Sequence, residues 1–341
     1  MKALFITRFG SPSVSFELKD APDPIPNEDE IVIKTEGFGI NYADVMARMG
    51  QYQDCPPLPA IVGYEVVGKI EKIGSNVHGF EYGDRVLAFT RFGAYAEKAK
   101  APAIACVKIN DSIPLDEATA LATQYCTAFY AAHISTRLFK NDHVLIQAAA
   151  GGVGTALVQM AKLKGCIVYG TAGSEEKCQH LKKIGVDFPI NYSTDDFVKR
   201  IRQIRNGKGV DVVFDSLGGI TFGKGFSLLN PTGRIIGFGA AESSGSNNPL
   251  GIIKLLFGFG FRSAVHLLIQ SRSINGLNML RVADHRPDIM QYCMESVVKL
   301  YQEGKIKPVR GGIFDSDKIA EAHSYVQSRN SKGKVAVKWV Q

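Results

Sequence analysis

The stretch that most constrains the fold of this chain is an apolar run over residues 143–149, which passes through a glycine-rich turn, 150–154, into a helical pattern. When a buried parallel strand delivers such a turn, it forms a cradle for a pyrophosphate, because glycine lets the backbone come close and the first helical amides are unpaired. On a G-x-G-x-x-G alignment the small positions are Ala149, Gly151 and Gly154. A turn that serves only tight packing carries the same letters, so the surrounding sequence must decide.

On both sides of this turn, apolar strand-like segments alternate with helical patterns from about residue 126 to 265. Alternation of this kind predicts an α/β fold with a parallel, doubly wound sheet. A further stretch, 273–279, is a candidate sixth strand. The expected strands are 143–149, 166–172, 188–192, 210–215 and 234–239, and the expected helices are 154–164, 175–184, 195–204 and 222–229.

Residues 1–125 have a different sequence pattern, in which short strand-like segments are separated by turn residues. This pattern predicts a β-rich, barrel-like domain. We expect one helix in it, at 42–49, with Asn41 as the N-cap residue and Asp44 at the third helical position. Asp44 and Arg48 are four residues apart on one face of this helix and are expected to form an ion pair.

The C-terminal part, residues 266–341, is expected to finish the α/β domain and then return to the first domain. Its first portion supplies the last strand and helix of the α/β domain. An amphipathic helix at 288–304 follows. The alternating strand 334–339 resembles the N-terminal strands, so we expect the chain end to fold back onto them.

The composition of the 341-residue chain, with 45% hydrophobic and 21% charged residues, is that of a globular protein with room for two domains. The net charge of +7 is spread along the chain without a basic block, which argues against a nucleic-acid partner. The six cysteines are scattered without a C-x-x-C pair, so we expect reduced thiols in the cytoplasm. The alternating start of the chain is typical of a strand rather than of a signal peptide.

One segment, 249–269, is rich in Leu, Ile and Phe and is interrupted by Lys254 and Arg262. Its longest apolar core, 255–261, is far shorter than the roughly 20 residues that a membrane-spanning helix needs. A buried helix or a lid over a hydrophobic site is one interpretation. A peripheral membrane contact through residues 250–269, supported by the two cations, is the other.

The end of the second α/β strand bears on the choice of cofactor. In NAD-binding units an acidic residue about 20 positions after the first small residue binds the ribose 2′-hydroxyl. Counting from Ala149 reaches Thr171, and no carboxylate follows before Glu175. Ser174 and Lys177 offer a hydroxyl and an ammonium that can pair with a phosphate. The sequence therefore favours NADPH over NADH, although Lys177 alone is equally compatible with an exposed helix charge.

Motifs along the whole chain carry a family resemblance. They are GINYADVMARMGQY at 39–52, PPLP at 56–59, GYEVVG at 63–68, AAGGVG at 149–154, INY at 190–192, DSLGG at 215–219, KGFSLLNP at 224–231 and LYQEGKIKP at 300–308. The chain resembles the zinc-independent quinone oxidoreductase branch of the medium-chain dehydrogenase/reductase superfamily, most closely its vesicle amine transport protein-like subgroup. The resemblance implies a GroES-like β domain that the C-terminus rejoins, an inserted Rossmann domain, and a homodimer formed through the Rossmann sheets.

The site residues follow in part from this resemblance. Asn41, Tyr52 and Thr127 are the expected catalytic residues, with the Asn41 amide and the Tyr52 hydroxyl as hydrogen-bond donors to the substrate. Tyr192 is expected to reach the 2′-phosphate, and Lys334 is a further cofactor contact. The expected cofactor-binding residues are Ala150, Gly151, Gly152, Val153, Gly154, Thr171, Ser174, Lys177, Tyr192, Ser216, Leu217, Phe238, Gly239 and Lys334.

No metal site is expected. Zinc-dependent relatives carry Cys and His where this sequence has Asn41 and Tyr64, and Cys126 is offset from the position of the third ligand. A structural or catalytic zinc ion needs about four ligands of the right type. The adjacent Glu65 is equally compatible with a buried structural role and a catalytic one.

Together these observations predict an NADPH-dependent, zinc-independent oxidoreductase. Its substrate would be a small, hydrophobic, electrophilic molecule, a quinone or an α,β-unsaturated carbonyl, because such acceptors take hydride without a Lewis acid when the site aligns them and donates a hydrogen bond. The alternative is a nucleotide-binding protein with little turnover that binds a membrane surface or a partner, as the vesicle-protein resemblance allows.

Overall fold

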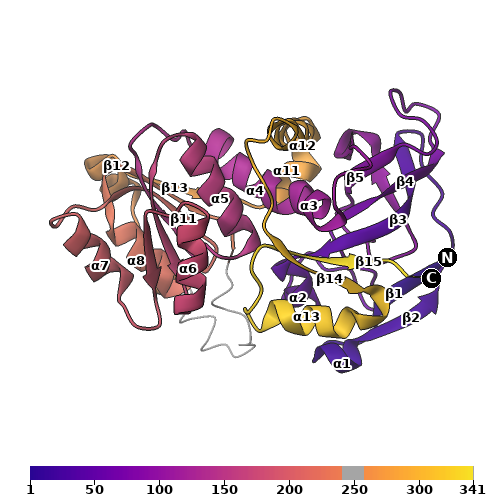
Figure 1. Cartoon of the computed structure of the whole chain (residues 1–341), viewed down its shortest axis with the longest axis horizontal. Helices are drawn as coiled ribbons and strands as arrows, with labels where there is room; N and C mark the ends of the chain where they lie inside the picture. The colour runs from indigo at the N-terminus through magenta and orange to yellow at the C-terminus, as the bar shows by residue number, and fades with distance from the viewer. Residues whose placement is uncertain (240–256, 341) are drawn as a thin grey trace. The chain divides into compact units, whose positions relative to one another are not determined.

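The computed structural model describes residues 1–239 and 257–340. The chain divides into two compact units, one formed by Met1–Cys126 with Met279–Gln341 and the other by Thr127–Asn278 (Figure 1). The first boundary lies one residue from the predicted one. The outer strand of the α/β sheet, Ser273–Gly276, lies in the portion 266–341 that was expected to supply the last strand of this domain. Part of the apolar segment, residues 249–256, lies outside the described residues.

The second unit contains a six-stranded parallel sheet in the order β10-β9-β8-β11-β12-β13. The order reverses between β8 and β11, so the carboxyl ends of these two strands flank the crevice in which such sheets bind ligands. The sequence-based prediction of a doubly wound sheet is confirmed. The elements are β8 (His143–Ile146), α5 (Gly152–Leu163), β9 (Ile167–Ala172), α6 (Glu175–Lys183), β10 (Phe188–Asn191), α7 (Phe197–Ile204), β11 (Val210–Asp215), α8 (Gly219–Ser227), β12 (Leu229–Gly237) and β13 (Ser273–Gly276).

The central strands of this sheet are buried on both faces, which explains their continuous apolar sequences. In β8 and β11, Leu145 and Val213 are fully buried and belong to one core cluster. The aromatic side chains of α8 pack into the same cluster. Its buried members are Leu145, Tyr169, Ile190, Phe197, Ile201, Val210, Val213, Phe222, Phe226, Leu228, Leu229 and Ile235.

The first unit is built on a seven-stranded sheet in the order β14-β15-β3-β4-β5-β7, with β6 paired to β3. A two-stranded antiparallel sheet of β1 and β2 completes its strands. The predicted β-rich domain is therefore confirmed. The strands are β1 (Lys2–Ile6), β2 (Phe16–Asp20), β3 (Glu30–Ile40), β4 (Glu65–Ile73), β5 (Arg85–Phe89), β6 (Lys98–Pro102), β7 (Cys106–Lys108), β14 (Arg310–Asp315) and β15 (Lys334–Lys338).

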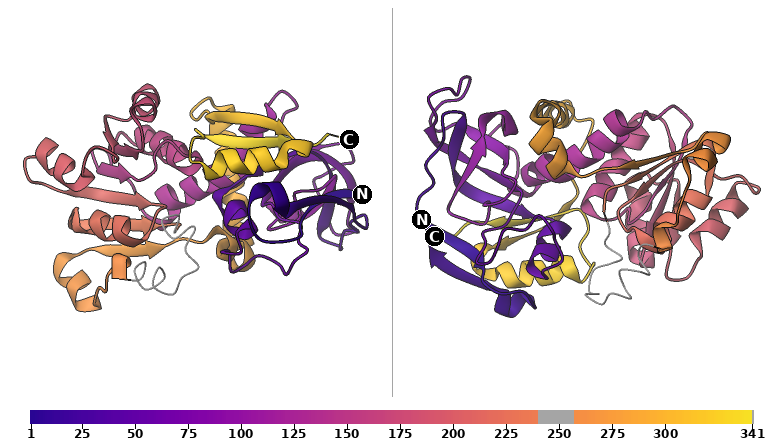
Figure 2. Two further views of the ribbon diagram at one scale, coloured as in Figure 1. Left: turned by 90° about the horizontal axis from the view of Figure 1, so that it is seen from below. Right: turned by 180° about the vertical axis from the view of Figure 1, so that it is seen from behind.

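The chain end returns to the N-terminal strands, as predicted. β15 pairs antiparallel with the last residues of β3, with Val335 opposite Ile40 and Ala336 opposite Gly39. Figure 2 shows from two further sides that the C-terminal strands and α13 (Ile319–Gln327) lie with the N-terminal strands. This pairing places Lys334, the first residue of β15, beside Asn41, the residue that follows β3.

A helical run that begins in the first unit and continues into the second was missed, since only one helix, α2 (Tyr42–Arg48), had been expected in the first domain. Residues 115–135 form α3 (Leu115–Ala120), the π-helix η2 (Leu121–Tyr125), α4 (Cys126–Phe129) and the π-helix η3 (Tyr130–Ser135). The sequence contains the signals: Pro114 precedes the helix, and Asp116 and Glu117 lie in its first turn. Short π-helices are rare in proteins overall, and those that do occur often lie at functional sites.

The remaining helical elements are short, apart from the amphipathic helix α12. None of the helices in the described ranges is both long enough and apolar enough to cross a membrane. These elements are α1 (Pro12–Ser15), η1 (Ala103–Ala105), α10 (Ala264–Gln270), α11 (Met279–His285), α12 (Pro287–Gln302) and η5 (Ser316–Lys318).

Candidate active site

The glycine-rich turn in the second unit has the geometry of a phosphate cradle. Gly151 is the extended N-cap residue of α5, which begins at Gly152. A Cβ atom on Gly154 would overlap the Ala148 carbonyl oxygen and lie 2.7 Å from the Ala149 Cα, so only glycine fits there. At Gly151 a Cβ would meet only the Ala148 carbonyl oxygen, at 3.3 Å. The first amides of α5 have no acceptors within the helix and can serve an anion.

Two buried polar side chains hold this turn in place. The Thr171 hydroxyl donates to Gln147 Oε1 at 2.6 Å and accepts the Ala148 N–H at 3.1 Å. The Thr171 side chain is fully buried. These bonds support a backbone that is strained at Ala148, whose φ of 49° lies in the left-handed region. Thr171, predicted to bind the cofactor, thus lies at the site with its hydroxyl engaged in shaping the turn.

The ends of β9 and β10 meet the start of α6 at Gly173. Ser174 is the N-cap residue of α6, and its hydroxyl accepts the Lys177 N–H at 3.3 Å. A Cβ on Gly173 would lie 2.6 Å from the Tyr192 hydroxyl oxygen, and the Ser193 hydroxyl donates to the Gly173 carbonyl at 2.9 Å. The structure therefore brings Ser174, Lys177 and Tyr192 to one corner of the sheet, and their role in binding a 2′-phosphate stays a prediction.

The ends of β11 and β12 form the other side of the carboxyl edge. The Asp215 carboxylate accepts the backbone N–H groups of Leu217 at 3.0 Å and Gly218 at 2.6 Å. The Phe238 N–H donates to the Asp215 carbonyl at 2.9 Å. A Cβ on Gly239 would lie 2.6 Å from the Ser216 carbonyl oxygen. The predicted residues Ser216, Leu217, Phe238 and Gly239 therefore lie together.

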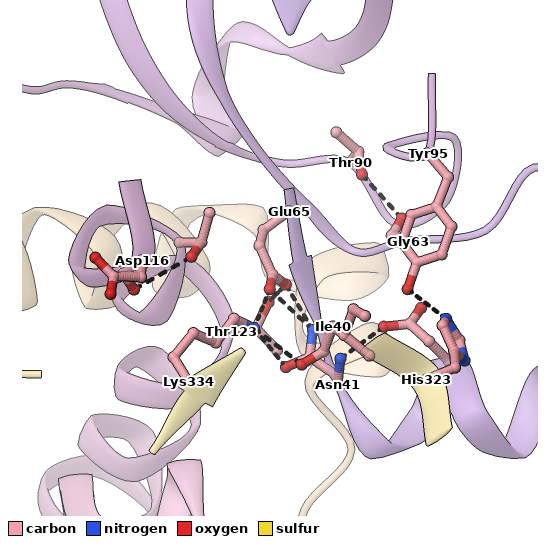
Figure 3. A network of polar contacts seen from close by, with 12 residues as sticks. Ile40, Asn41, Gly63, Glu65, Thr90, Tyr95, Asp116, Thr123, His323 and Lys334 are labelled. Atoms are coloured by element: carbon pink, nitrogen blue, oxygen red, sulfur yellow. Dashed lines mark hydrogen bonds and ion pairs between the residues drawn. The ribbon is translucent and has the colours of Figure 1, made fainter. Parts of the chain in front are cut away.

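The first unit holds a buried polar network around Asn41 (Figure 3). The Asn41 Nδ2 donates to both oxygens of Glu65, at 2.7 and 3.0 Å. The Lys334 ammonium donates to Asn41 Oδ1 at 3.0 Å and also to Glu65 Oε1. The Thr123 hydroxyl, from η2, donates to the other Glu65 oxygen. The side chains of Lys334 and Glu65 are both fully buried.

Asp44 and Arg48 do not form the predicted ion pair. Asp44 Oδ2 accepts the Asn41 backbone N–H at 2.8 Å, which is the capping arrangement that the sequence suggested. Arg48 donates instead to the Gly10 carbonyl and to Gln327. Because Asp44 is fully buried, with the Glu65 charge nearby, its pKa is raised to about 8.

Tyr52 and Tyr64 form an aromatic pair in the same unit. Their ring centroids are 6.1 Å apart in an edge-to-face arrangement. Burial raises the pKa of both phenols above the ordinary value of about 10, so both stay protonated at neutral pH. Tyr52 is half-buried and Asn41 is 9% exposed. Thr127, the third predicted catalytic residue, belongs to the second unit and is buried in α4.

Sequence reasoning missed the link between Glu65, Thr123 and Lys334. It left the role of Glu65 open and assigned Lys334 to the cofactor. In the structure the Lys334 ammonium is engaged within the first unit, and its cofactor contact stays a prediction. One available signal was Gly39, because a glycine inside a strand often marks a close approach. A Cβ there would overlap Glu65 Oε1 and the Lys334 ammonium.

These features define a class of protein: a β-rich domain that the C-terminal strands complete, joined to a doubly wound domain with a dinucleotide-type glycine turn. Family models agree, since the alcohol dehydrogenase GroES-like domain matches residues 27–111 and the zinc-binding dehydrogenase domain matches residues 152–292. The chain belongs to the medium-chain dehydrogenase/reductase superfamily, in the branch of quinone oxidoreductases and VAT-1-like proteins.

Individual relatives match along nearly the whole chain. The human synaptic vesicle membrane protein VAT-1 homolog is 32% identical over 98% of this chain and 86% of its own length. The structure of the human VAT-1 homolog-like protein has a TM-score of 0.85 at 28% identity, covering 99% of this chain and 98% of that one. The Escherichia coli quinone oxidoreductase, solved with NADPH, has a TM-score of 0.85 at 27% identity, covering 99% of this chain and all (100%) of that one.

The zinc named in the family description does not fit the residues present. In the described part of the chain, no group of three or more His, Cys, Asp or Glu side chains is arranged to hold a metal ion. The Asn41 amide is engaged by Glu65, and Tyr64 stays a neutral phenol. Cys126 is a single buried thiol whose Sγ donates to the Leu121 carbonyl, whereas a zinc site needs about four ligands of the right type. Zinc independence remains a prediction.

Proposed function

We propose that this protein is an NADPH-dependent oxidoreductase that transfers hydride to a quinone or an α,β-unsaturated carbonyl without zinc. The observation that carries the proposal is the turn between β8 and α5, where Gly151 has room beside it and the first amides of α5 lack acceptors within the helix. This turn follows β8, one of the two strands between which the strand order reverses. The NADPH complexes of the Escherichia coli quinone oxidoreductase and of a mycobacterial structural neighbour support the choice of cofactor. A cytoplasmic location and a small hydrophobic substrate belong to the same proposal.

The residues at the carboxyl edge fit a phosphorylated dinucleotide. The amides of Gly152, Val153 and Gly154 would bind the pyrophosphate, with Ala150 and Gly151 leaving room for it. Ser174, Lys177 and Tyr192 would hold the 2′-phosphate through a hydroxyl, an ammonium and a phenol. Ser216, Leu217, Phe238 and Gly239 would line the other side, and Thr171 would hold the turn. When bound, NADPH supplies the hydride from C4 of its nicotinamide.

The first unit would supply the hydrogen bonds that the acceptor needs. Negative charge develops on the carbonyl or quinone oxygen as hydride arrives, and a positioned neutral donor stabilises that charge. The Tyr52 phenol is a protonated donor at neutral pH. The Asn41 amide is the second donor, and Thr127 is the proposed third polar residue of the site.

Direct titration tests the cofactor half of the proposal. Nucleotide binding is measured by the quenching of intrinsic fluorescence, with NADPH and NADH compared at equal ionic strength. We expect NADPH to bind at least about tenfold more tightly, which corresponds to one charge-assisted hydrogen bond. Equal affinity for the two nucleotides would contradict the assignment of Ser174, Lys177 and Tyr192 to a 2′-phosphate.

An exposed apolar surface on the second unit supports a homodimer as part of the proposal. Leu267 of α10 packs beside the core cluster, whereas the opposite face of this helix is apolar and exposed. Within the described residues β13 is the outer strand of the sheet, and α10 leads into it. A second copy related by a two-fold axis would extend the sheet and cover α10. The exposed residues are Phe257, Phe261, Val265, Leu268, Ile269 and Ile274.

The same surface favours one second candidate function, a membrane-surface protein with little turnover. The named VAT-1 relatives are synaptic vesicle membrane proteins. Co-sedimentation with anionic phospholipid vesicles tests this candidate, using Leu268→Glu and the control Ile25→Glu, an exposed apolar residue of the first unit. Vesicle binding that the wild type and Ile25→Glu retain and Leu268→Glu loses would favour the membrane-surface function. Low binding by all three proteins would exclude it.

A further inference from the structure

The Lys334 ammonium is fully satisfied inside the first unit. Its three acceptors are Glu65 Oε1, Asn41 Oδ1 at 3.0 Å and the Ile40 carbonyl at 3.4 Å. An ammonium has three N–H groups, so these acceptors account for all of them. The space for the ion pair exists because Gly39 has no side chain: a Cβ there would overlap both charged groups. Lys334 is therefore built into the fold as an internal cation.

This cation fixes which way the Asn41 amide points. A carboxylate only accepts hydrogen bonds and an ammonium only donates them. Asn41 Nδ2 faces the Glu65 carboxylate and Oδ1 faces the Lys334 ammonium. A rotation of the amide by half a turn would place N–H groups against the ammonium and an oxygen against the carboxylate. The two buried charges thus select one of the two amide orientations.

The selected orientation leaves one N–H of Asn41 for another acceptor. The two N–H bonds of a primary amide diverge, whereas the two oxygens of a single carboxylate are adjacent. One N–H therefore serves both Glu65 oxygens, at 2.7 and 3.0 Å, and the other points away from them. The Asn41 backbone is held as well, because its N–H donates to Asp44 at 2.8 Å. Asn41 is 9% exposed, whereas Glu65 and Lys334 are fully buried.

We propose that Lys334 and Glu65 are positioning residues that lock the Asn41 amide with one N–H presented to the oxygen of the hydride acceptor. The proposal rests on the function proposed above. It gives Lys334 a role toward the acceptor rather than toward the cofactor phosphates. Thr123, in the π-helix η2, assists by donating to the second Glu65 oxygen.

The test removes both charges together. Lys334→Met alone would leave Glu65 buried without a counter-charge, which is strongly destabilising. The double variant Glu65→Gln/Lys334→Met keeps similar volumes and leaves the Asn41 amide free to adopt either orientation. Lys338→Met, at an exposed lysine on the same strand, is the matched control. Far-ultraviolet circular dichroism and thermal unfolding are used to check that each variant is folded.

The first measurement needs no turnover. The Asn41 side-chain amide signals are identified in ¹H–¹⁵N spectra by their loss in Asn41→Asp. We expect a single well-separated pair of signals in the wild type and in Lys338→Met, and shifted or split signals in the double variant. Unchanged Asn41 signals in a folded double variant would contradict the proposal that Glu65 and Lys334 fix the orientation of the Asn41 amide.

The second measurement separates the acceptor from the cofactor. In the double variant we expect the NADPH Kd to change by less than about twofold, while kcat/KM for the acceptor falls by about 10- to 100-fold through misplacement of one donor. An NADPH Kd weakened by more than about tenfold would assign Lys334 to the cofactor instead, and an unchanged kcat/KM would also overturn the proposal. If the wild type turns over no acceptor, the proposed function is wrong. The amide spectra still show whether Glu65 and Lys334 fix the orientation of the Asn41 amide.

Discussion

At the residue scale, the two glycines of the phosphate turn have separable roles. Gly154 is required by packing, because a side chain would collide with the backbone of Ala148 and Ala149. Gly151 has more room and faces the region where the pyrophosphate would lie. Folding and cofactor binding therefore depend on different members of one motif.

We predict that Gly154→Ala destabilises the protein by about 1–3 kcal/mol, the usual cost of an overpacked position. Gly151→Ala should change the free energy of unfolding much less but weaken NADPH binding. Urea denaturation and NADPH titration of both variants check this. A Gly151→Ala protein with unaltered NADPH affinity would show that the turn serves packing alone.

Asp44 is a second residue with a measurable signature, since its folded-state pKa of about 8 lies far above the ordinary value of 3.8. Between these two values the unfolded chain releases the Asp44 proton while the folded protein keeps it. Stability therefore falls as pH rises through this window, by at most about 1.4 kcal/mol per pH unit from this group. Below the window the carboxyl is protonated in both states and contributes no slope.

Asp44→Asn should remove that slope, because an amide oxygen can still accept the Asn41 N–H without titrating. Thermal unfolding of the variant and the wild type from pH 5.5 to 8 measures the difference. We expect the variant to gain stability relative to the wild type as pH rises. Groups that do not interact with Asp44 contribute equally to both proteins and cancel in the difference. A pH-independent difference would contradict a raised Asp44 pKa.

At the element scale, local sequence patterns predicted the structural features that depend on residues close together in the sequence. The alternation of strands and helices and the turn at Gly154 follow from apolar periodicity and small residues, and the structure confirms them. The network at Asn41 could not be predicted in this way, because its partners Glu65 and Lys334 are 24 and 293 residues away along the chain. The predicted ion pair of Asp44 and Arg48 does not form. Their spacing on the helix shows that the two side chains could meet, but it does not show which other partners compete for them.

The start of α6 carries the prediction for cofactor choice. Lys177→Ala should weaken NADPH binding by about 10- to 100-fold, the worth of a charge-assisted hydrogen bond to phosphate, and change NADH binding little. Lys183→Ala, at the exposed end of the same helix, is the control for a general loss of positive charge. An equal effect of Lys177→Ala on both nucleotides would show that Lys177 is not the phosphate partner.

At the scale of the whole molecule, the outer strand β13 and the exposed face of α10 set the expected assembly. Leu268 and Ile269 are 76% and 73% exposed, which is unusual for two neighbouring apolar residues on a helix. We predict a dimer in sedimentation velocity that Leu268→Glu shifts towards monomer and that Ile25→Glu leaves intact. A monomeric wild type at micromolar concentration would contradict this assembly.

The central claim is that the protein uses NADPH to reduce an electrophilic acceptor. The most direct measurement is the loss of NADPH absorbance when purified protein is mixed with quinones, with α,β-unsaturated carbonyls, and with saturated ketones as a control. We predict oxidation of NADPH that depends on a quinone or an unsaturated carbonyl, with slower oxidation of NADH and none with the saturated ketones. Tight NADPH binding without oxidation by any acceptor would contradict the claim.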